Sequence, residues 1–244
     1  MAWHHPTSSL TTAASEGWAF ISSALWRASW LDENGDPHKD DHVLEEGARF
    51  ADSVLDRIVT LRNNDFPVTA SLYVATPECI LAPKGYKGNS VSLMHTILDD
   101  TIPASAIQTY DLDKPASSIA VFSCSPALQA VWNQVAPQGK VIPLVERDLQ
   151  FVFSKTEANL MFIHILAGYV QVSVKQANGL TLCNAFRYQE SEEANLMLKG
   201  VIQHFFQENV YPIYLAGNGG TRDYLLENLP NAHAVERDHD FWTS

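Results

Sequence analysis

The order of predicted strands and helices constrains this chain most, because a similar order occurs twice. In the second half, apolar runs with a period of two residues predict three strands, and Asn178-Gly179 marks a tight turn between the last two. A helix with acidic residues in its first turn follows, then a buried strand and a last helix that Thr221 caps. These elements are predicted at residues 160–165, 169–176, 180–184, 191–206, 211–216 and 221–229.

The first half shows a comparable order with less regular passages. Two paired strands precede a long helix that begins at Asp41, and a strand, a short helix and another strand come next. A helix opened by Pro126 and a further strand complete this half. The strands are predicted at residues 18–22, 25–31, 69–75, 118–124 and 140–144, and the short helix at 91–98. Residues 145–155 fit no single pattern.

This alternation of strands and helices predicts an α/β protein made of two halves, each with a mixed β-sheet flanked by helices. No stretch repeats letter by letter, so the duplication is one of architecture. We expect a loose N-terminal tail at residues 1–16, a first half at 17–140 and a second half at 141–244.

Charge and cysteine content restrict the possible partners and the compartment. The 244 residues include 16 basic and 28 acidic side chains, a formal net charge of −12. An acidic surface repels phosphate backbones and anionic lipid, so we expect no nucleic-acid partner. No segment reaches the roughly 20 apolar residues that a membrane-spanning helix needs. Three widely spaced cysteines, without a secretory signal, predict a soluble protein of the reducing cytoplasm.

Tryptophans are concentrated near the N-terminus, and Trp26 and Trp30 lie four residues apart in one predicted strand. Side chains at this spacing project from the same face of a strand, opposite to Leu25 and Leu31. Such an aromatic face is either part of the protein's own core, the more common case, or contacts a protein partner. Trp26 and Trp30 are therefore candidate interaction residues.

Two further groups of residues suggest chemistry only weakly. His38, Asp40, Asp41 and His42 could ligate a metal, but a helix that begins at Asp41 leaves His38 outside it, so we predict no metal site. Ser125 follows a strand without the glycines of a nucleophile elbow, and capping of the next helix explains it. We predict no catalytic residue.

The order of the elements resembles the actin-like ATPase fold of actin, sugar kinases, Hsp70 chaperones and bacterial division and pilus-assembly proteins. The segment Leu182-Cys183-Asn184-Ala185-Phe186-Arg187-Tyr188 resembles the L-x-N-x-F-x-Y strand exit of a bacterial family of uncharacterised proteins with this fold. Ile80-Leu81-Ala82-Pro83 resembles that family's L-V-P step. The resemblance covers most of residues 18–242 and implies a duplicated, ribonuclease-H-like architecture.

The resemblance also implies a Mg²⁺–ATP site, for which each half must supply an acid and a glycine in a phosphate-binding hairpin. The first hairpin, Ile21 to Leu25, has neither. The second retains Gly168 but has His164 where an aspartate is wanted, and imidazole is a poor Mg²⁺ ligand. The adenosine-binding turn is matched loosely by Gly217, Asn218, Gly219 and Gly220.

These departures predict a non-catalytic scaffold or protein-interaction module with a degenerate nucleotide site, no cofactor and an unidentified protein partner. The alternative is an ATPase or phosphotransferase with non-standard ligands, for which Asp32 or Asp36 would supply the acid. A third possibility is a cleft that binds a small ligand other than a nucleotide. A carboxylate that faces the cleft between the halves would distinguish the enzyme from the other two.

Overall fold

The computed structural model describes residues 17–45, 47–86, 88–98, 100–115, 117–177, 179–206, 211–217 and 219–235. The expected tail at residues 1–16 and two residues of predicted turns, Asn178 and Asn218, lie outside the described residues. No helix in these ranges is both long and apolar enough to cross a membrane.

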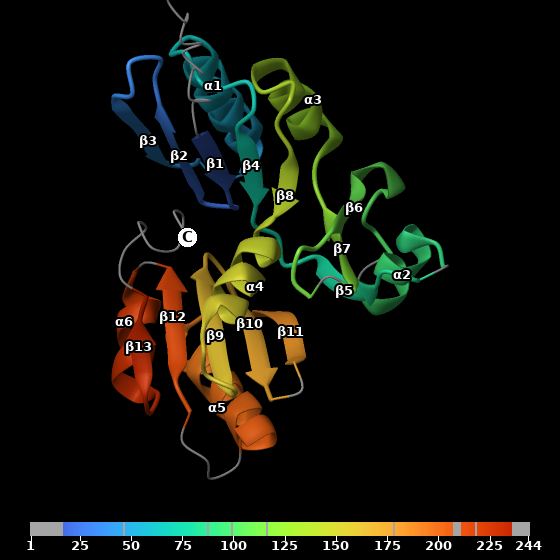
Figure 1. Ribbon diagram of the computed structural model, residues 1–244, viewed down its shortest axis with the longest axis vertical. Coiled ribbons are helices and arrows are strands. Elements are labelled where there is room, and N and C mark those ends of the chain that lie inside the picture. The colour runs from blue at the N-terminus through green and yellow to red at the C-terminus, as the bar shows by residue number, and fades with distance from the viewer. Residues whose placement is uncertain are drawn as a thin grey trace, which may run out of the picture.

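The first half is built on a five-stranded mixed sheet in the order β3-β2-β1-β4-β8 (Figure 1). Strands β1, β2 and β3 form an antiparallel meander, and β4 and β8 add to it in parallel. The strands are β1 Gly17–Ile21, β2 Leu25–Leu31, β3 Pro37–Val43, β4 Ser71–Val74 and β8 Val141–Pro143. Because β8 belongs to this sheet, the sheet extends past the expected boundary at residue 140.

The helix predicted from Asp41 is wrong: residues 37–43 form β3, and the helix α1 begins at Phe50 and ends at Arg62. Strand β3 is polar and almost wholly exposed, so its sequence lacks the apolar alternation that identifies strands. Pairing with β2 holds it in place, together with the ion pair between Arg27 and Asp41. One face of this sheet packs against α1 and α3, which spans Pro126–Val135.

The second half repeats the arrangement in a sheet of order β11-β10-β9-β12-β13 (Figure 1). Its strands are β9 Leu160–Leu166, β10 Tyr169–Gln176, β11 Gly179–Arg187, β12 Ile213–Gly217 and β13 Ala232–Ala234. The helices α5, Ser191–Phe206, and α6, Gly220–Asn228, cover one face. The predicted duplication is therefore confirmed, and of the strands in this sheet only the short edge strand β13 was not predicted.

Residues 79–123 form a small third unit beside the first sheet (Figure 1). It contains β5 Cys79–Pro83, α2 Ser90–Ile97, β6 Ile107–Asp111 and β7 Ser118–Ser123, and its sheet has the order β5-β7-β6. Single 3-10 turns occur at Gly47–Arg49 and Ala104–Ala106. We refer to residues 79–123 as the inserted unit.

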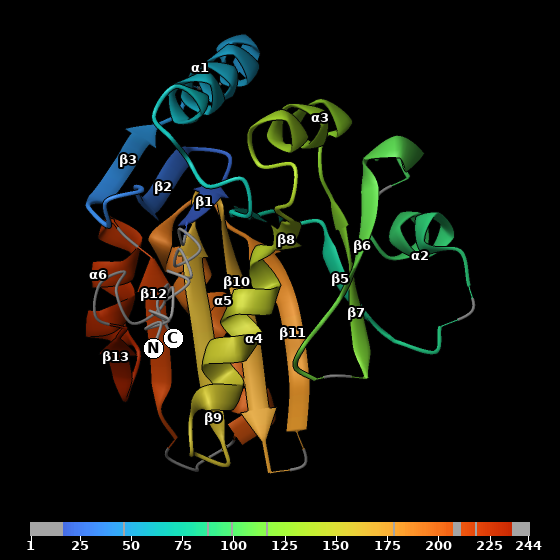
Figure 2. The ribbon, with the colours of Figure 1, turned by 45° about the horizontal axis from the view of Figure 1, so that its top comes forward.

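The segment without a clear sequence pattern is the helix α4, Leu144–Ser154, which leads from the first sheet to the second. It lies across β9 and β10, on the face opposite to α5 (Figure 2). Phe151 and Val152 of α4 join Phe20 of β1 and Phe162 of β9 in one buried cluster. The two halves therefore share a core.

Candidate functional site

A cavity of about 260 Å³ lies where three turns meet, between the two halves. The β1–β2 turn contributes Ser22 and Ala24, the β9–β10 turn contributes Ala167, and the β12–α6 turn contributes Gly217, Gly219, Gly220 and Thr221. The structure thus brings together the three segments that the sequence analysis compared with an ATP site. Gly168 lines an adjoining open surface together with Ser23 and Ala24.

The glycines of the β12–α6 turn have different roles. Gly217 has a φ of 103°, and a Cβ there would lie 2.2 Å from the carbonyl oxygen of Ile165 on β9. Gly219 has a φ of 95° and is the N-cap residue of α6, so the prediction that Thr221 caps this helix is wrong. Thr221 lies in the first turn, where its hydroxyl is 2.9 Å from that of Ser191 on α5.

Two arginines supply positive charge to the cavity wall, Arg27 from β2 and Arg222 from α6. The Nε atom of Arg27 lies 3.1 Å from Oδ1 of Asp41. Arg222 donates a hydrogen bond from Nη1 to the carbonyl oxygen of Gly217, at 3.1 Å. Among the described residues that line the cavity there is no aspartate or glutamate.

His164 lines the cavity where the fold resemblance implied an acid, and a second residue fixes it there. Its Nδ1 lies 2.8 Å from Oδ1 of Asp148, on α4. Asp148 is fully buried, and this burial raises the pKa of its carboxyl group. Asp148 therefore positions the imidazole through this contact but does not itself line the cavity. Sequence analysis missed Asp148 because it lies in the segment without a pattern.

The described residues do not fit a Mg²⁺–nucleotide complex. Mg²⁺ selects oxygen ligands, above all carboxylates, and the cavity wall offers arginine and imidazole nitrogen instead. Asp32 and Asp36, the acids of the alternative hypothesis, lie in the β2–β3 turn and do not line it. Hydrogen bonds, first of all from the backbone of Asp36, lower the pKa of Asp32. In the described ranges, no group of three or more His, Cys, Asp or Glu side chains is arranged so that it could hold a metal ion.

The size of the cavity also argues against a Mg²⁺–nucleotide complex. Pockets for drug-sized ligands usually measure about 300–1,000 Å³, so about 260 Å³ is small for a whole nucleotide. Phe20 forms part of the wall and also belongs to the core that the halves share. The space is better matched to a compact polar group.

A wider groove of about 590 Å³ opens between the first sheet and the inserted unit, and sequence analysis did not find it. Serine and threonine hydroxyls and apolar side chains line it together. Its one charged side chain among the described residues is Glu78. This carboxylate accepts hydrogen bonds from Thr76 at 2.6 Å and Ser123 at 3.2 Å, and it pairs with Arg187 of β11.

Trp26 and Trp30, the candidate interaction residues, lie in the core of the first half, with 0% and 5% of their surface exposed. The indole of Trp26 donates to Asp40 at 2.9 Å and that of Trp30 to the carbonyl oxygen of Asn64 at 3.2 Å. The expectation that they contact a partner is therefore wrong for this structure. Their face of β2 is the one that α1 and α3 cover.

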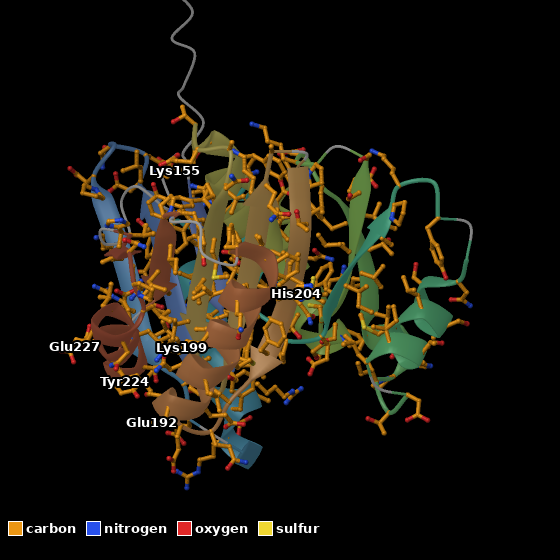
Figure 3. The ribbon with its side chains drawn as sticks, turned by 90° about the horizontal axis from the view of Figure 1, so that it is seen from below. Lys155, Glu192, Lys199, His204, Tyr224 and Glu227 are labelled. Atoms are coloured by element: carbon orange, nitrogen blue, oxygen red, sulfur yellow. The ribbon has the colours of Figure 1, made fainter. Side chains whose placement is uncertain are left out.

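The weaker candidates also have structural roles or lie elsewhere. His42 is 2.7 Å from Asp40, and His38 is 3.1 Å from Asp32. Ser125 is the N-cap residue of α3, but its side chain makes no capping hydrogen bond. On α5, Lys199 in the middle of the helix and His204 near its end are both exposed (Figure 3).

Comparison with known proteins finds no matching family model and no matching curated protein. Solved structures do match. A Bacteroides thetaiotaomicron protein with an actin-like ATPase fold and unknown function superposes with a TM-score of 0.77 at 11% identity, over 94% of each chain. A chain of the PilM–PilN type IV pilus biogenesis complex matches with a TM-score of 0.55 at 12% identity, over 90% of this chain and 88% of that one. The chain therefore has an actin-like ATPase fold.

Proposed function

We propose that this chain is a non-catalytic protein that acts by binding a protein partner, with a degenerate nucleotide site. The observation that carries the proposal is the wall of the cavity at the three turns, where the described residues include two arginines and no carboxylate. Without a carboxylate, nothing there holds Mg²⁺ on a phosphate group, and phosphoryl transfer depends on that charge neutralisation.

The first test is equilibrium binding of ATP with and without Mg²⁺, together with phosphate release over time. We expect that Mg²⁺ does not strengthen binding and that no turnover is detected, because the cation has no carboxylate ligand in the cavity. Micromolar affinity that requires Mg²⁺, together with hydrolysis, would overturn the proposal.

The surface that we assign to the partner is the groove between the first sheet and the inserted unit. Interface cores are depleted in charge, and the one charged side chain among the groove's described lining residues, Glu78, is already paired with Arg187. The PilM–PilN complex offers a parallel at the level of fold, because one chain of that protein–protein complex has this architecture.

The groove can be tested with one substitution made at two places. Ser125 is exposed at the groove and its side chain does not cap α3, so Ser125→Tyr should narrow the groove without loss of stability. Ser92→Tyr, at an exposed position of α2, is the matched control. In affinity capture from the native host, we expect the Ser125 variant alone to lose the partner that the parent protein recovers. Equal recovery by both variants would exclude the groove.

The alternative function is an ATPase or phosphotransferase with non-standard ligands. One observation favours it, which is that the three turns of a nucleotide site meet around a single cavity. Under that alternative, Arg27 and Arg222 would have to supply the charge that Mg²⁺ supplies elsewhere. The ATP measurements separate the two functions directly.

A further inference from the structure

The two arginines of the cavity come from different halves of the molecule. Arg27 belongs to the meander of the first half and Arg222 to the last helix of the second. The chain as a whole carries a net charge of −12, so a cavity with two guanidinium groups and no carboxylate among its described lining residues is a local exception. Such a concentration of one sign of charge favours an anion.

Arg222 shows the clearest sign that an acceptor is missing. Its Nη1 is held by the carbonyl oxygen of Gly217, which fixes the guanidinium at the cavity wall. Its Nε is buried and has no hydrogen-bond partner among the described residues. A buried charged donor without a hydrogen-bond acceptor destabilises the folded state, and native proteins rarely contain such a donor. An oxyanion in the cavity would supply the acceptor, in the paired geometry that guanidinium groups prefer.

The N-terminus of α6 adds to the positive electrostatic potential in the cavity. Its N-cap residue, Gly219, has no side-chain oxygen with which to satisfy the first N–H groups, and the positive end of a helix dipole attracts anions. Asp223 in the first turn is exposed, where solvent screens its opposing charge. On the other side of the cavity, the ion pair with Asp41 anchors Arg27.

We propose that this cavity binds a metal-free oxyanion of the size of inorganic phosphate, held between Arg27 and Arg222. Its volume of about 260 Å³ accommodates such an ion with a few waters. Because each half contributes one arginine, the bound anion joins the two halves and stabilises the folded protein. The inference rests on the part of the proposed function that excludes Mg²⁺–nucleotide from this cavity.

The test is a titration of the whole chain with sodium phosphate, in the presence of EDTA and with ionic strength held constant by sodium chloride. Isothermal calorimetry gives the affinity, and thermal unfolding gives the stabilisation. We expect saturable binding of one phosphate per chain and a rise in the unfolding temperature. Arg27→Gln and Arg222→Gln should each weaken binding about tenfold or more, since each removes charge-assisted hydrogen bonds. Arg62→Gln, at an exposed site on α1, should bind like the parent.

The proposal is overturned if phosphate adds nothing beyond chloride, if Arg222→Gln binds as tightly as the parent, or if binding requires Mg²⁺. Circular dichroism without phosphate shows whether each variant folds. Arg222→Lys keeps the positive charge but loses the forked guanidinium group, so its affinity for phosphate should lie between those of the parent and Arg222→Gln. Failure here is distinct from failure of the proposed function. ATP turnover would refute that function even if free phosphate bound, and absent phosphate binding would refute this inference even if turnover were also absent.

Discussion

Gly217 shows how one residue position joins two strands of the second sheet. It ends β12 beside β9, where the backbones pass so closely that any side chain would collide with the carbonyl oxygen of Ile165. Its φ is also positive, a backbone conformation that is strained for residues other than glycine. Gly219 shares only the positive φ, and Gly220 has neither constraint, since nothing lies within 4 Å of a Cβ built there.

We therefore predict a graded series at the residue scale. Gly217→Ala should lower the free energy of unfolding by more than about 2 kcal/mol, Gly219→Ala by about 1 kcal/mol, and Gly220→Ala by almost nothing. Urea denaturation of the three variants measures the series. Equal losses at Gly217 and Gly220 would show that the close approach to Ile165 does not matter for stability.

At the scale of elements, α4 is unusual because it buries three consecutive charged residues, Glu146, Arg147 and Asp148. The helix packs on β9 and β10 of the second sheet and contacts β8 of the first, and most of its residues are buried. Glu146 accepts hydrogen bonds from the side chain of Gln150 at 2.8 Å and from the backbone N–H of Asp113 at 3.3 Å. Burial raises the pKa of Glu146 to about 7.

This raised pKa makes the stability depend on pH. The folded protein keeps the Glu146 proton up to about pH 7, whereas the unfolded chain releases it near 4.5. The contribution of this group to folding is thus fully present below pH 4.5 and is lost as the pH rises through 7. Glu146→Gln, which cannot ionise, should be more stable than the parent at pH 8 by about 1 kcal/mol or more, and show no such advantage at pH 4.5.

The measurement is urea denaturation of parent and variant between pH 4.5 and 8. Glu33→Gln, in the exposed β2–β3 turn, is the control and should follow the parent throughout. If the Glu146 variant also follows the parent at every pH, the carboxyl group titrates normally in the folded protein.

The whole molecule is held together by a core that both halves supply. Phe20 comes from the first sheet, Phe162 from the second, and Phe151 of α4 lies 4.8 Å from the ring of Phe162 and 5.6 Å from that of Tyr214. Because this buried cluster combines Phe20 and Ala75 of the first half with residues of the second, neither half can lose its structure without exposing apolar surface of the other. We expect the halves to unfold together.

Phe151→Ala should accordingly lower the free energy of unfolding by about 3–5 kcal/mol, the usual cost of removing a buried aromatic side chain. The loss should appear in a single transition, with equal calorimetric and van't Hoff enthalpies in the parent. Phe153→Ala, at a half-buried position of the same helix, should cost less. Two separate transitions in the parent protein would show instead that the halves fold independently.

Several elements could not be predicted from the sequence, for identifiable reasons. Strand β3 is a polar edge strand and has no apolar period. The helix α4 has an apolar face, but the consecutive charged residues Glu146, Arg147 and Asp148 interrupt the apolar sequence and are buried as well. Strands β5 and β6 belong to the inserted unit, whose pairing is set by contacts with β7. The role of Trp26 was misjudged because strand spacing shows which residues share a face, not what covers that face.

The sequence by itself determined the repeated order of meander, helix and strand, and with it the actin-like fold, because local periodicity and turn residues encode these elements. It also determined that both phosphate-binding hairpins lack an acid. Only the tertiary structure decided that Arg27 and Arg222 line one cavity with the β12–α6 glycines, and that Asp148 holds His164. These contacts depend on how the two halves and the connecting helix pack. Arg27 and Arg222 are 195 positions apart, and nothing in the sequence indicates that they will be neighbours.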